Sequence, residues 1–245
     1  MMIEKLGDLI IAGFRGAKIN NSTKIQHWIN EYGLSGVILY DIDLELNKPG
    51  TRNIKSEKQL RELISSLKNK STNSLLIAID QEGGQVNRLK SEYGFPKFIS
   101  WKDVGLEDSF HFTKSYSKRL ANVLYDLGIN LNFAPVLDIN GVSQVIGDRA
   151  FSDSADDVIR LAAHLIQGLK AVNMPAIGKH FPGHGSVAPD SHVALPVDER
   201  EFDGIRSTDM VVFERLIERA LLDGVMPAHV IYNQVCDKPA GFSTK

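Results

Sequence analysis

Short apolar segments alternate along the chain with longer segments whose apolar residues recur at helical spacing. The short segments are rich in Val, Ile and Leu, and most are apolar at every position. Strands of a parallel sheet that is covered on both faces have this composition. We expect six such strands, at residues 9–14, 36–40, 75–80, 130–136, 176–179 and 224–229.

The longer segments predict amphipathic helices. Ser56 and Gln59 have the spacing of a helix N-terminal capping box. The apolar residues that follow them at helical intervals are Leu60, Leu63, Ile64 and Leu67. Further helices are expected at residues 112–127, 153–172 and 208–222. Gly128 and Gly224 would end the first and the last of these three.

The alternation of strand and helix in one chain predicts a parallel α/β fold with right-handed crossovers. Two architectures agree with the pattern, a doubly wound sheet and a TIM-type (β/α) barrel. No GxGxxG motif follows the first strand, which weakens the dinucleotide-binding version of the doubly wound sheet. We count about six β/α units, whereas a closed barrel has about eight. We expect a single domain over residues 1–245.

The composition is that of an ordinary globular protein, with 43% hydrophobic and 24% charged residues. The net charge of −2 provides no basic surplus for a nucleic acid or a membrane surface. Cys236 is the only cysteine, so no internal disulfide can form. The apolar run at residues 9–14 is too short to cross a membrane, and no cleavage site follows a basic leader. We therefore expect a cytoplasmic protein with no nucleic-acid partner and no membrane partner.

Ionisable residues stand at the ends of several predicted strands. They are Asp80, Asp138, Lys179, His180 and His229. In parallel α/β folds the carboxyl ends of the strands carry the active site. Any one of these residues could instead make a structural hydrogen bond or salt bridge. Packing explains the whole set poorly, because a buried unpaired charge is costly.

The densest polar segment reads KHFPGHGSVAPDSH and covers residues 179–192. Its glycines and prolines exclude a regular helix and predict a long loop after a strand. Asp190 and His192 are two residues apart in this loop, so their side chains can meet. A carboxylate raises the pKa of a neighbouring imidazole and orients it, which suits general acid–base catalysis. Taken alone, such a pair would more often be a structural hydrogen bond.

A second polar segment, DQEGGQVNR, covers residues 80–88. Its paired glycines allow a sharp turn and a close approach of the backbone to a ligand. Asp80 could accept hydrogen bonds from sugar hydroxyls, and Arg88 could donate to a hydroxyl or to an anion. Arg149 lies in the GDRAF segment on another expected loop, although such an arginine alone is more often a solvated surface residue.

Taken together, these segments resemble a known family. DQEGGQVNRL, NFAPVLDIN, VIGDRAFS and KHFPGHG-x4-DSH-x2-LP occur in this order and at family-like spacing. They are similar to segments of the bacterial β-N-acetylglucosaminidases of glycoside hydrolase family 3, the peptidoglycan-recycling branch. GVILYDIDL and GVMPAHVIYNQVCDKPAGFS also match, so the resemblance covers nearly the whole chain. The KHFPGHG-to-DSH segment separates this branch from the β-glucosidases of the family.

The resemblance implies a retaining glycosidase that removes β-linked N-acetylglucosamine from peptidoglycan-derived fragments, such as those that carry 1,6-anhydro-N-acetylmuramic acid. It implies that His192 is the general acid/base on a mobile loop and that Asp190 tunes it. Most retaining glycosidases use two carboxylates, whereas this branch has His in place of one of them. The residues implied to bind the sugar are Asp80, Arg88, Arg149, Lys179 and His180. The resemblance implies a small-molecule sugar substrate, no cofactor and no metal.

The resemblance also implies an incomplete barrel. In the family, a PASFS-like segment precedes another helix and a seventh strand, which carries the nucleophilic aspartate. Here PAGFSTK ends the sequence. We therefore expect the given chain to lack the nucleophile and the last two β/α units, to bind sugar weakly and to turn over poorly.

Other classes of function use some of the same residues. A metal-dependent hydrolase could take its ligands from His180, His184, Asp190, His192 and His229. The first two have the spacing of helical zinc sites, but the proline and glycine between them predict a loop. A non-catalytic sugar-binding or regulatory domain would bind its ligand without hydrolysis. A glucosidase of the same family is disfavoured by the DSH segment.

Overall fold

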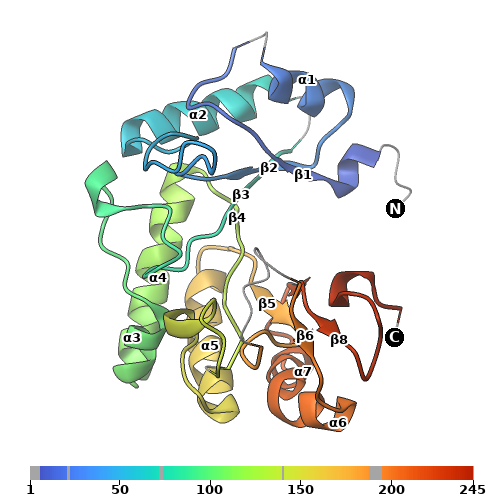
Figure 1. The fold of residues 1–245 in the computed structure, drawn as a ribbon. Coiled ribbons are helices and arrows are strands. Elements are labelled where there is room, and N and C mark those ends of the chain that lie inside the picture. Colours follow the sequence, from blue (N-terminus) through green and yellow to red (C-terminus); the bar gives the residue numbers. More distant parts are fainter. Residues whose placement is uncertain (1–5, 21–22, 72–73, 140, 188–194, 245) are drawn as a thin grey trace. The chain divides into compact units, whose positions relative to one another are not determined.

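A computed structural model describes residues 6–20, 23–71, 74–139, 141–187 and 195–244. The chain divides into two compact units, whose elements are shown in Figure 1. Unit 1 comprises Met1–Gln81, Asn87–Phe98 and Asn122–Asn132. Unit 2 comprises Glu82–Val86, Ile99–Ala121 and Phe133–Lys245. Helix α4 (Phe110–Leu127) begins in unit 2 and ends in unit 1.

Unit 1 contains a four-stranded parallel sheet with the strands in sequence order. The strands are β1 (Ile11–Gly13), β2 (Gly36–Leu39), β3 (Leu76–Ile79) and β4 (Leu131–Asn132). Val37 lies in register with Ala12 on one side and with Ile77 on the other. A doubly wound sheet reverses its strand order partway, so the sequential order favours the barrel-type arrangement.

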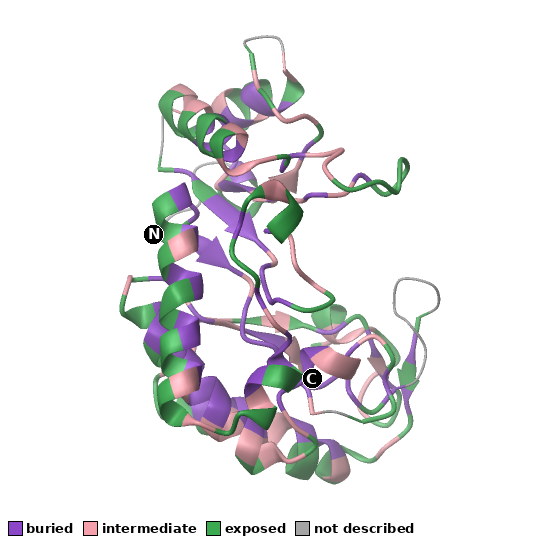
Figure 2. Ribbon diagram, turned by 90° about the vertical axis from the view of Figure 1, so that its left-hand side faces the viewer, coloured by how far each residue is buried: buried purple, intermediate pink, exposed green. Residues whose placement is uncertain are grey.

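The helices of unit 1 are α1 (Lys24–Glu31) and α2 (Glu57–Lys70), with short 3₁₀ turns at Leu6–Leu9 and Ser91–Tyr93. The predicted N-cap of α2 is confirmed, because Ser56 Oγ accepts a hydrogen bond from the backbone N–H of Gln59 at 3.3 Å. The four predicted apolar residues of α2 are all buried. In Figure 2 the strands of this unit are drawn mostly as buried residues, while its helices also carry bands of exposed residues.

Unit 2 contains two pairs of parallel strands. Strand β5 (Ile177–Phe181) pairs with β7 (Gly224–Pro227), and β6 (Val197–Asp198) pairs with β8 (Ile231–Tyr232). The β6–β8 pair was not predicted, because strands of two residues carry no readable periodicity. The predicted strand 130–136 is wrong in its second half, where Val136 makes only an isolated bridge to Lys179.

The helices of unit 2 are α3 (Trp101–Leu106), α5 (Ala155–Lys170), α6 (Phe202–Ile205) and α7 (Val211–Glu218), besides the first part of α4. Short 3₁₀ turns occur at Gly147–Arg149 and Ala240–Phe242. The apolar face predicted for residues 153–172 is buried in α5, and it consists of Val158, Leu161, Ala162, Leu165, Ile166 and Leu169. The helix predicted at 208–222 instead begins at Phe202 and passes through a π-helical segment, Arg206–Met210. The regular spacing of its apolar residues is interrupted by the buried Asp209. The Oδ2 atom of Asp209 lies 2.8 Å from Arg200 Nη1.

No helix within the described residues is long and apolar enough to cross a membrane. The parallel strand–helix architecture predicted from the sequence is confirmed within each unit. The expectation of a single domain over residues 1–245 stays a prediction.

Candidate active site

Buried charged side chains gather around Glu82 in unit 2. Arg149 donates two hydrogen bonds to its carboxylate, from Nε to Oε2 at 2.8 Å and from Nη2 to Oε1 at 2.9 Å. Lys179 places its Nζ 2.6 Å from Oε1. The exposed fractions of Glu82, Lys179 and Arg149 are only 1%, 2% and 9%. One carboxylate therefore holds two cations in a region that water barely reaches.

Two opposing effects determine the pKa of Glu82: burial and the charged partners of its carboxylate. Burial alone would raise the pKa of Glu82, but Lys179 and Arg149 outweigh this effect and lower the pKa to about 2. Glu82 is therefore charged at neutral pH. Two cations against one carboxylate leave this group with one surplus positive charge, which suits the electron-rich oxygens of a polar ligand.

A tight turn places Glu82 in this position. The backbone N–H groups of Glu82 and Gly83 both donate to the carbonyl of Val86, at 3.0 and 3.1 Å. Gly83 has φ of +104°, and a Cβ built there would lie 2.1 Å from the carbonyl oxygen of Ile99. Glycine is therefore required at this position, as the paired glycines of the sequence indicated.

His180 and Asp138 form a second pair in the same unit. His180 Nδ1 lies 2.6 Å from Asp138 Oδ2, and the backbone N–H of His184 donates to Asp138 Oδ1 at 2.6 Å. Burial would raise the pKa of Asp138, but its interactions with His180, the hydrogen bond from the backbone of His184 and the charge of Arg149 together outweigh burial and lower the pKa. Because an ionised carboxylate can only accept, His180 Nδ1 carries the hydrogen of this bond.

Arg149 connects the Glu82 cluster with the pair formed by His180 and Asp138. Its Nη2 lies 3.4 Å from His180 Nε2 and also donates to Glu82. An arginine N–H can only donate, so this contact favours the tautomer in which Nε2 is an acceptor. With 17% of its side chain exposed, His180 is more accessible than Lys179 or Arg149. His180 is therefore the member of the cluster that a ligand reaches most easily.

Lys179 and His180 lie near the carboxyl end of a strand, as predicted. The predicted strand ended at Lys179, whereas β5 continues to Phe181, so both residues lie within it. Successive residues of a regular strand point to opposite faces, yet both side chains reach the same cluster. The pairing of β5 with β7 is irregular between Lys179 and Phe181, and such a disturbance re-aims side chains.

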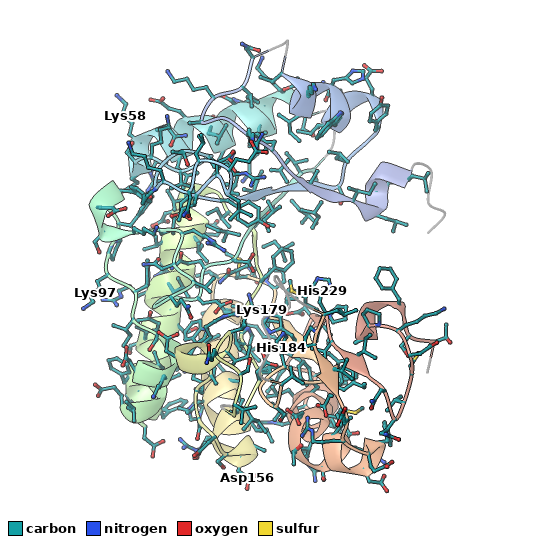
Figure 3. All side chains as sticks on the ribbon, in the orientation of Figure 1. Lys58, Lys97, Asp156, Lys179, His184 and His229 are labelled. Atoms are coloured by element: carbon teal, nitrogen blue, oxygen red, sulfur yellow. The ribbon has the colours of Figure 1, made fainter. Side chains whose placement is uncertain are left out.

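His184 lies next to this cluster and is 3% exposed. Burial lowers its pKa, so the ring is neutral at pH 7. Its Nδ1 is 3.5 Å from Ser143 Oγ, and its Nε2 has no hydrogen-bond partner among the described residues. Figure 3 labels Lys179 and His184 among the side chains of unit 2.

The residues considered as metal ligands are placed only in part. Asp190 and His192 lie outside the described residues. His229 is exposed just after β7, as the strand-end pattern predicted. Within the part of the chain that the structure describes, no group of three or more His, Cys, Asp or Glu is arranged to hold a metal ion.

Asp80 and Arg88 belong to unit 1. Asp80 directly follows β3, as predicted, and is half-buried. The backbone N–H of Arg88 donates to the side-chain oxygen of Gln81 at 2.9 Å. Its Nη1 lies 3.7 Å from Asp41 Oδ1.

The structure thus brings Arg149, Lys179 and His180 together within unit 2, and it places the other two predicted sugar-binding residues in unit 1. The sequence analysis did not identify Glu82, which binds Arg149 and Lys179. The available signal was an acidic side chain directly before two glycines in the DQEGG segment. Asp138 was predicted to lie at a strand end, but no role was assigned to it from the sequence.

Comparison with known proteins identifies the family of the chain. Residues 1–245 match the family model described as the glycosyl hydrolase family 3 N terminal domain. A β-hexosaminidase of Idiomarina loihiensis is 44% identical over 195 residues, which cover 79% of this chain and 58% of that protein. One of Methylobacillus flagellatus is 44% identical over 219 residues, which cover 86% and 59%. The chain thus spans less than two thirds of the length of these curated relatives.

Solved structures are similar over nearly the whole chain. The structure of NagZ from Neisseria gonorrhoeae in complex with N-trifluoroacetyl-D-glucosamine has a TM-score of 0.84 at 34% identity and covers 96% of this chain and 67% of that one. A family 3 β-N-acetylglucosaminidase from a Paenibacillus species has a TM-score of 0.87 at 32% identity and covers 99% and 45%. With the family model matched from end to end, the chain belongs to glycosyl hydrolase family 3 and carries its N-terminal, TIM-like α/β domain.

Proposed function

We propose that this chain is the sugar-binding and acid–base part of a β-N-acetylhexosaminidase that acts in the cytoplasm. The substrates are β-linked N-acetylglucosaminides of peptidoglycan turnover, of the N-acetylglucosaminyl-anhydromuramyl type. The observation that carries the proposal is the buried Glu82 cluster, which fixes Arg149, Lys179 and His180 next to one another. The neisserial relative solved with a glucosamine derivative supports this substrate class.

The cluster suits a ligand rich in hydroxyl groups. Arg149 and Lys179 are donors only, whereas a hydroxyl oxygen accepts as well as donates. Because Glu82 already holds both cations, little side-chain entropy is lost when a ligand binds. His180, the most exposed of the three, contacts the sugar first. We also propose Asp80 and Arg88, which belong to unit 1, as sugar-binding residues.

In the proposed reaction His192 is the general acid/base, and Asp190 orients it and tunes its proton affinity. His192 donates a proton to the glycosidic oxygen as a carboxylate attacks the anomeric carbon and the aglycone leaves. It then takes a proton from the water that releases the sugar. Neither Glu82 nor Asp138 suits the role of the nucleophile, because both are buried and their oxygens already bind other groups.

We further propose that the chain forms a single barrel-type domain of about six β/α units, with the sugar site at the carboxyl ends of the strands. The sequential order of the strands in unit 1 supports this arrangement. Within each unit taken by itself, polar side chains lie near the carboxyl end of a strand: Asp80 after β3 in unit 1, and the Glu82 cluster at β5 in unit 2.

The test is hydrolysis of a fluorogenic β-N-acetylglucosaminide by the full chain, together with titration of N-acetylglucosamine by NMR. Replacing His192→Ala should lower turnover at least ~100-fold, the contribution of a general acid/base, and leave sugar binding intact. The control is His111→Ala, since His111 is exposed on α4. Measurable turnover that is equal in wild type and His192→Ala would contradict the assigned role.

A second candidate, a non-catalytic sugar-binding domain, is favoured by one observation. The buried carboxylates of the cluster are occupied as counter-ions and are not free to attack a substrate. This alternative predicts sugar binding that is lost in Arg149→Lys, which removes the two-pronged contact with Glu82, without any hydrolysis in the wild-type chain.

A further inference from the structure

A second buried carboxylate, Asp41, lies in unit 1 just after β2. It is 0% exposed. Its Oδ2 lies 2.7 Å from Lys90 Nζ and accepts a hydrogen bond from the hydroxyl of Tyr93 at 3.4 Å. A charge buried this deeply is stable only with partners, and these two contacts account for one of its two oxygens.

The other oxygen of Asp41 faces Arg88. Asp41 Oδ1 has no hydrogen-bond partner among the described residues and lies 3.7 Å from Arg88 Nη1. At that distance the interaction is electrostatic, without a hydrogen bond. Burial lowers the effective dielectric constant around the carboxylate and strengthens its attraction for the guanidinium.

The aromatic ring of Tyr40 also restricts the movement of the Arg88 guanidinium. The Cζ atom of Arg88 lies 5.5 Å from the centre of the Tyr40 ring, within the range of a cation–π contact. Arg52 lies over the same ring at 4.8 Å, and its Nε donates to the carbonyl of Phe14 at 3.0 Å. The ring is therefore itself held in place by a second, anchored arginine.

The backbone of Arg88 is fixed by Gln81. The side-chain oxygen of Gln81 accepts the backbone N–H groups of both Arg88 and Leu89, at 2.9 Å each. Gln81 is 0% exposed, and its backbone exchanges two hydrogen bonds with the side chain of Asn132. Arg88 is thus restrained at its base by Gln81 and at its tip by Asp41 and Tyr40, while 24% of its side chain stays exposed.

We infer that Asp41 is a positioning residue for sugar binding, which acts by orienting the guanidinium of Arg88. This inference rests on the proposed function, because it takes Arg88 as a sugar-binding residue. An arginine held in advance loses less conformational entropy when it binds a ligand than a free one does. Asp41 thus plays for Arg88 in unit 1 the part that Glu82 plays for Arg149 in unit 2.

The experiment compares Asp41→Asn with Asp43→Asn in the full chain. Asp43 is a matched control, because it follows the same strand, is 3% exposed and pairs with Arg15 at 2.6 Å. The first measurement is the ¹⁵N order parameter of Arg88 Nε, with Arg88→Lys used to identify the signal. The second is the dissociation constant of N-acetylglucosamine.

In Asp41→Asn we expect the order parameter to fall from a rigid value to below about 0.6. We also expect the dissociation constant to rise about fivefold. Asp43→Asn should change neither quantity. A purely structural role for Asp41 would lower stability and leave the order of Arg88 unchanged, and that result would overturn the inference. Loss of order without a change in affinity would overturn it too.

The proposed function can fail separately. If the wild-type chain binds no N-acetylglucosamine, the proposed function is wrong, whereas a fall in Arg88 order in Asp41→Asn would still support the orienting contact. Should Asp41→Asn not fold, Tyr40→Leu removes the ring from the guanidinium and keeps the carboxylate. Because Asp41 remains, Arg88 should largely keep its order there, and a loss of order as large as that expected for Asp41→Asn would count against the inference.

Discussion

Units 1 and 2 each contain a buried carboxylate that faces an arginine and a lysine, but the two clusters differ in how far their cations are buried. Around Glu82 the contacts are 2.6–2.9 Å, and both cations are nearly inaccessible. Around Asp41 the lysine contact is 2.7 Å and the arginine contact 3.7 Å, and the two cationic side chains are 28% and 24% exposed. Similar residue types thus form one closed and one partly open cluster.

This difference has consequences for both stability and binding. When all partners are buried, the loss of one leaves the others uncompensated in a medium of low dielectric constant. When the cations reach water, solvent screens them after such a loss. We therefore expect the Glu82 cluster to behave as a rigid element of the fold, and the Asp41 cluster to behave as a support for one exposed side chain.

The largest expected effect is that of Glu82→Gln. It leaves Arg149 and Lys179 buried without their counter-ion and should lower the free energy of unfolding by about 4 kcal/mol. Urea denaturation of the full chain at neutral pH measures it. The control Glu57→Gln breaks an exposed pair with Arg61 and should cost no more than about 0.5 kcal/mol. A cost of less than about 1 kcal/mol for Glu82→Gln would remove the contrast between the clusters.

The contribution of Glu82 to stability should also depend on pH in the acid range. The pKa of Glu82 is lowered from an ordinary value of 4.5 to about 2 in the folded chain, so its contribution to stability is complete above the unfolded-state value. That contribution is lost as the pH falls from about 4.5 towards about 2. The difference in unfolding free energy between wild type and Glu82→Gln should shrink over this window. A difference that stays constant down to the lower limit would contradict the assignment.

The turn that carries Glu82 gives the next effect in size. Gly83→Ala places a Cβ against the carbonyl of Ile99 at a positive φ, and we expect a loss of about 3 kcal/mol. Gly94→Ala in unit 1 also has a positive φ, but nothing lies within 4 Å of its added Cβ, so about 1 kcal/mol is expected. Thermal and urea unfolding measure the loss of unfolding free energy in both variants. Equal losses would show that the positive φ alone sets the cost and that the contact with Ile99 adds nothing.

Apart from the two comparison variants, Glu57→Gln and Gly94→Ala, the smallest effect is expected for the stability of Asp41→Asn. Lys90 and Arg88 are partly exposed and can turn towards water, so about 2 kcal/mol should be lost, half the effect of Glu82→Gln. Urea denaturation of both variants under one set of conditions makes the comparison. Equal losses would mean that the partial exposure of the cations does not relieve the buried charge.

Several elements could be predicted from the sequence because their signals are local. The apolar faces of α2 and α5 are confirmed residue by residue, and the cap at Ser56 is present. The strands β2 and β3 were predicted within one residue at each end. The short pair β6–β8 and the π-helical segment could not be predicted, since each depends on partners elsewhere in the chain.

The candidate site was predicted in part. Lys179, His180 and Arg149 were named from their motifs and do meet in unit 2. Glu82 was missed because its partner Arg149 lies 67 residues further along the chain, and no spacing rule connects them. Asp41 was missed for the same reason, since its contact with Arg88 joins the end of one strand to the turn after the next. The assignment of Asp190 and His192 stays a prediction.

By itself, the sequence determined the alternation of strands and helices, the family and the residue types of the site, because periodicity and motif order are local properties of the chain. The tertiary structure alone decided which charges are buried together. The stability of a buried charge depends on the distance to its partners and on the exclusion of water. Both depend on how distant segments pack, which is why Glu82 forms a closed cluster with its cations and Asp41 an open one.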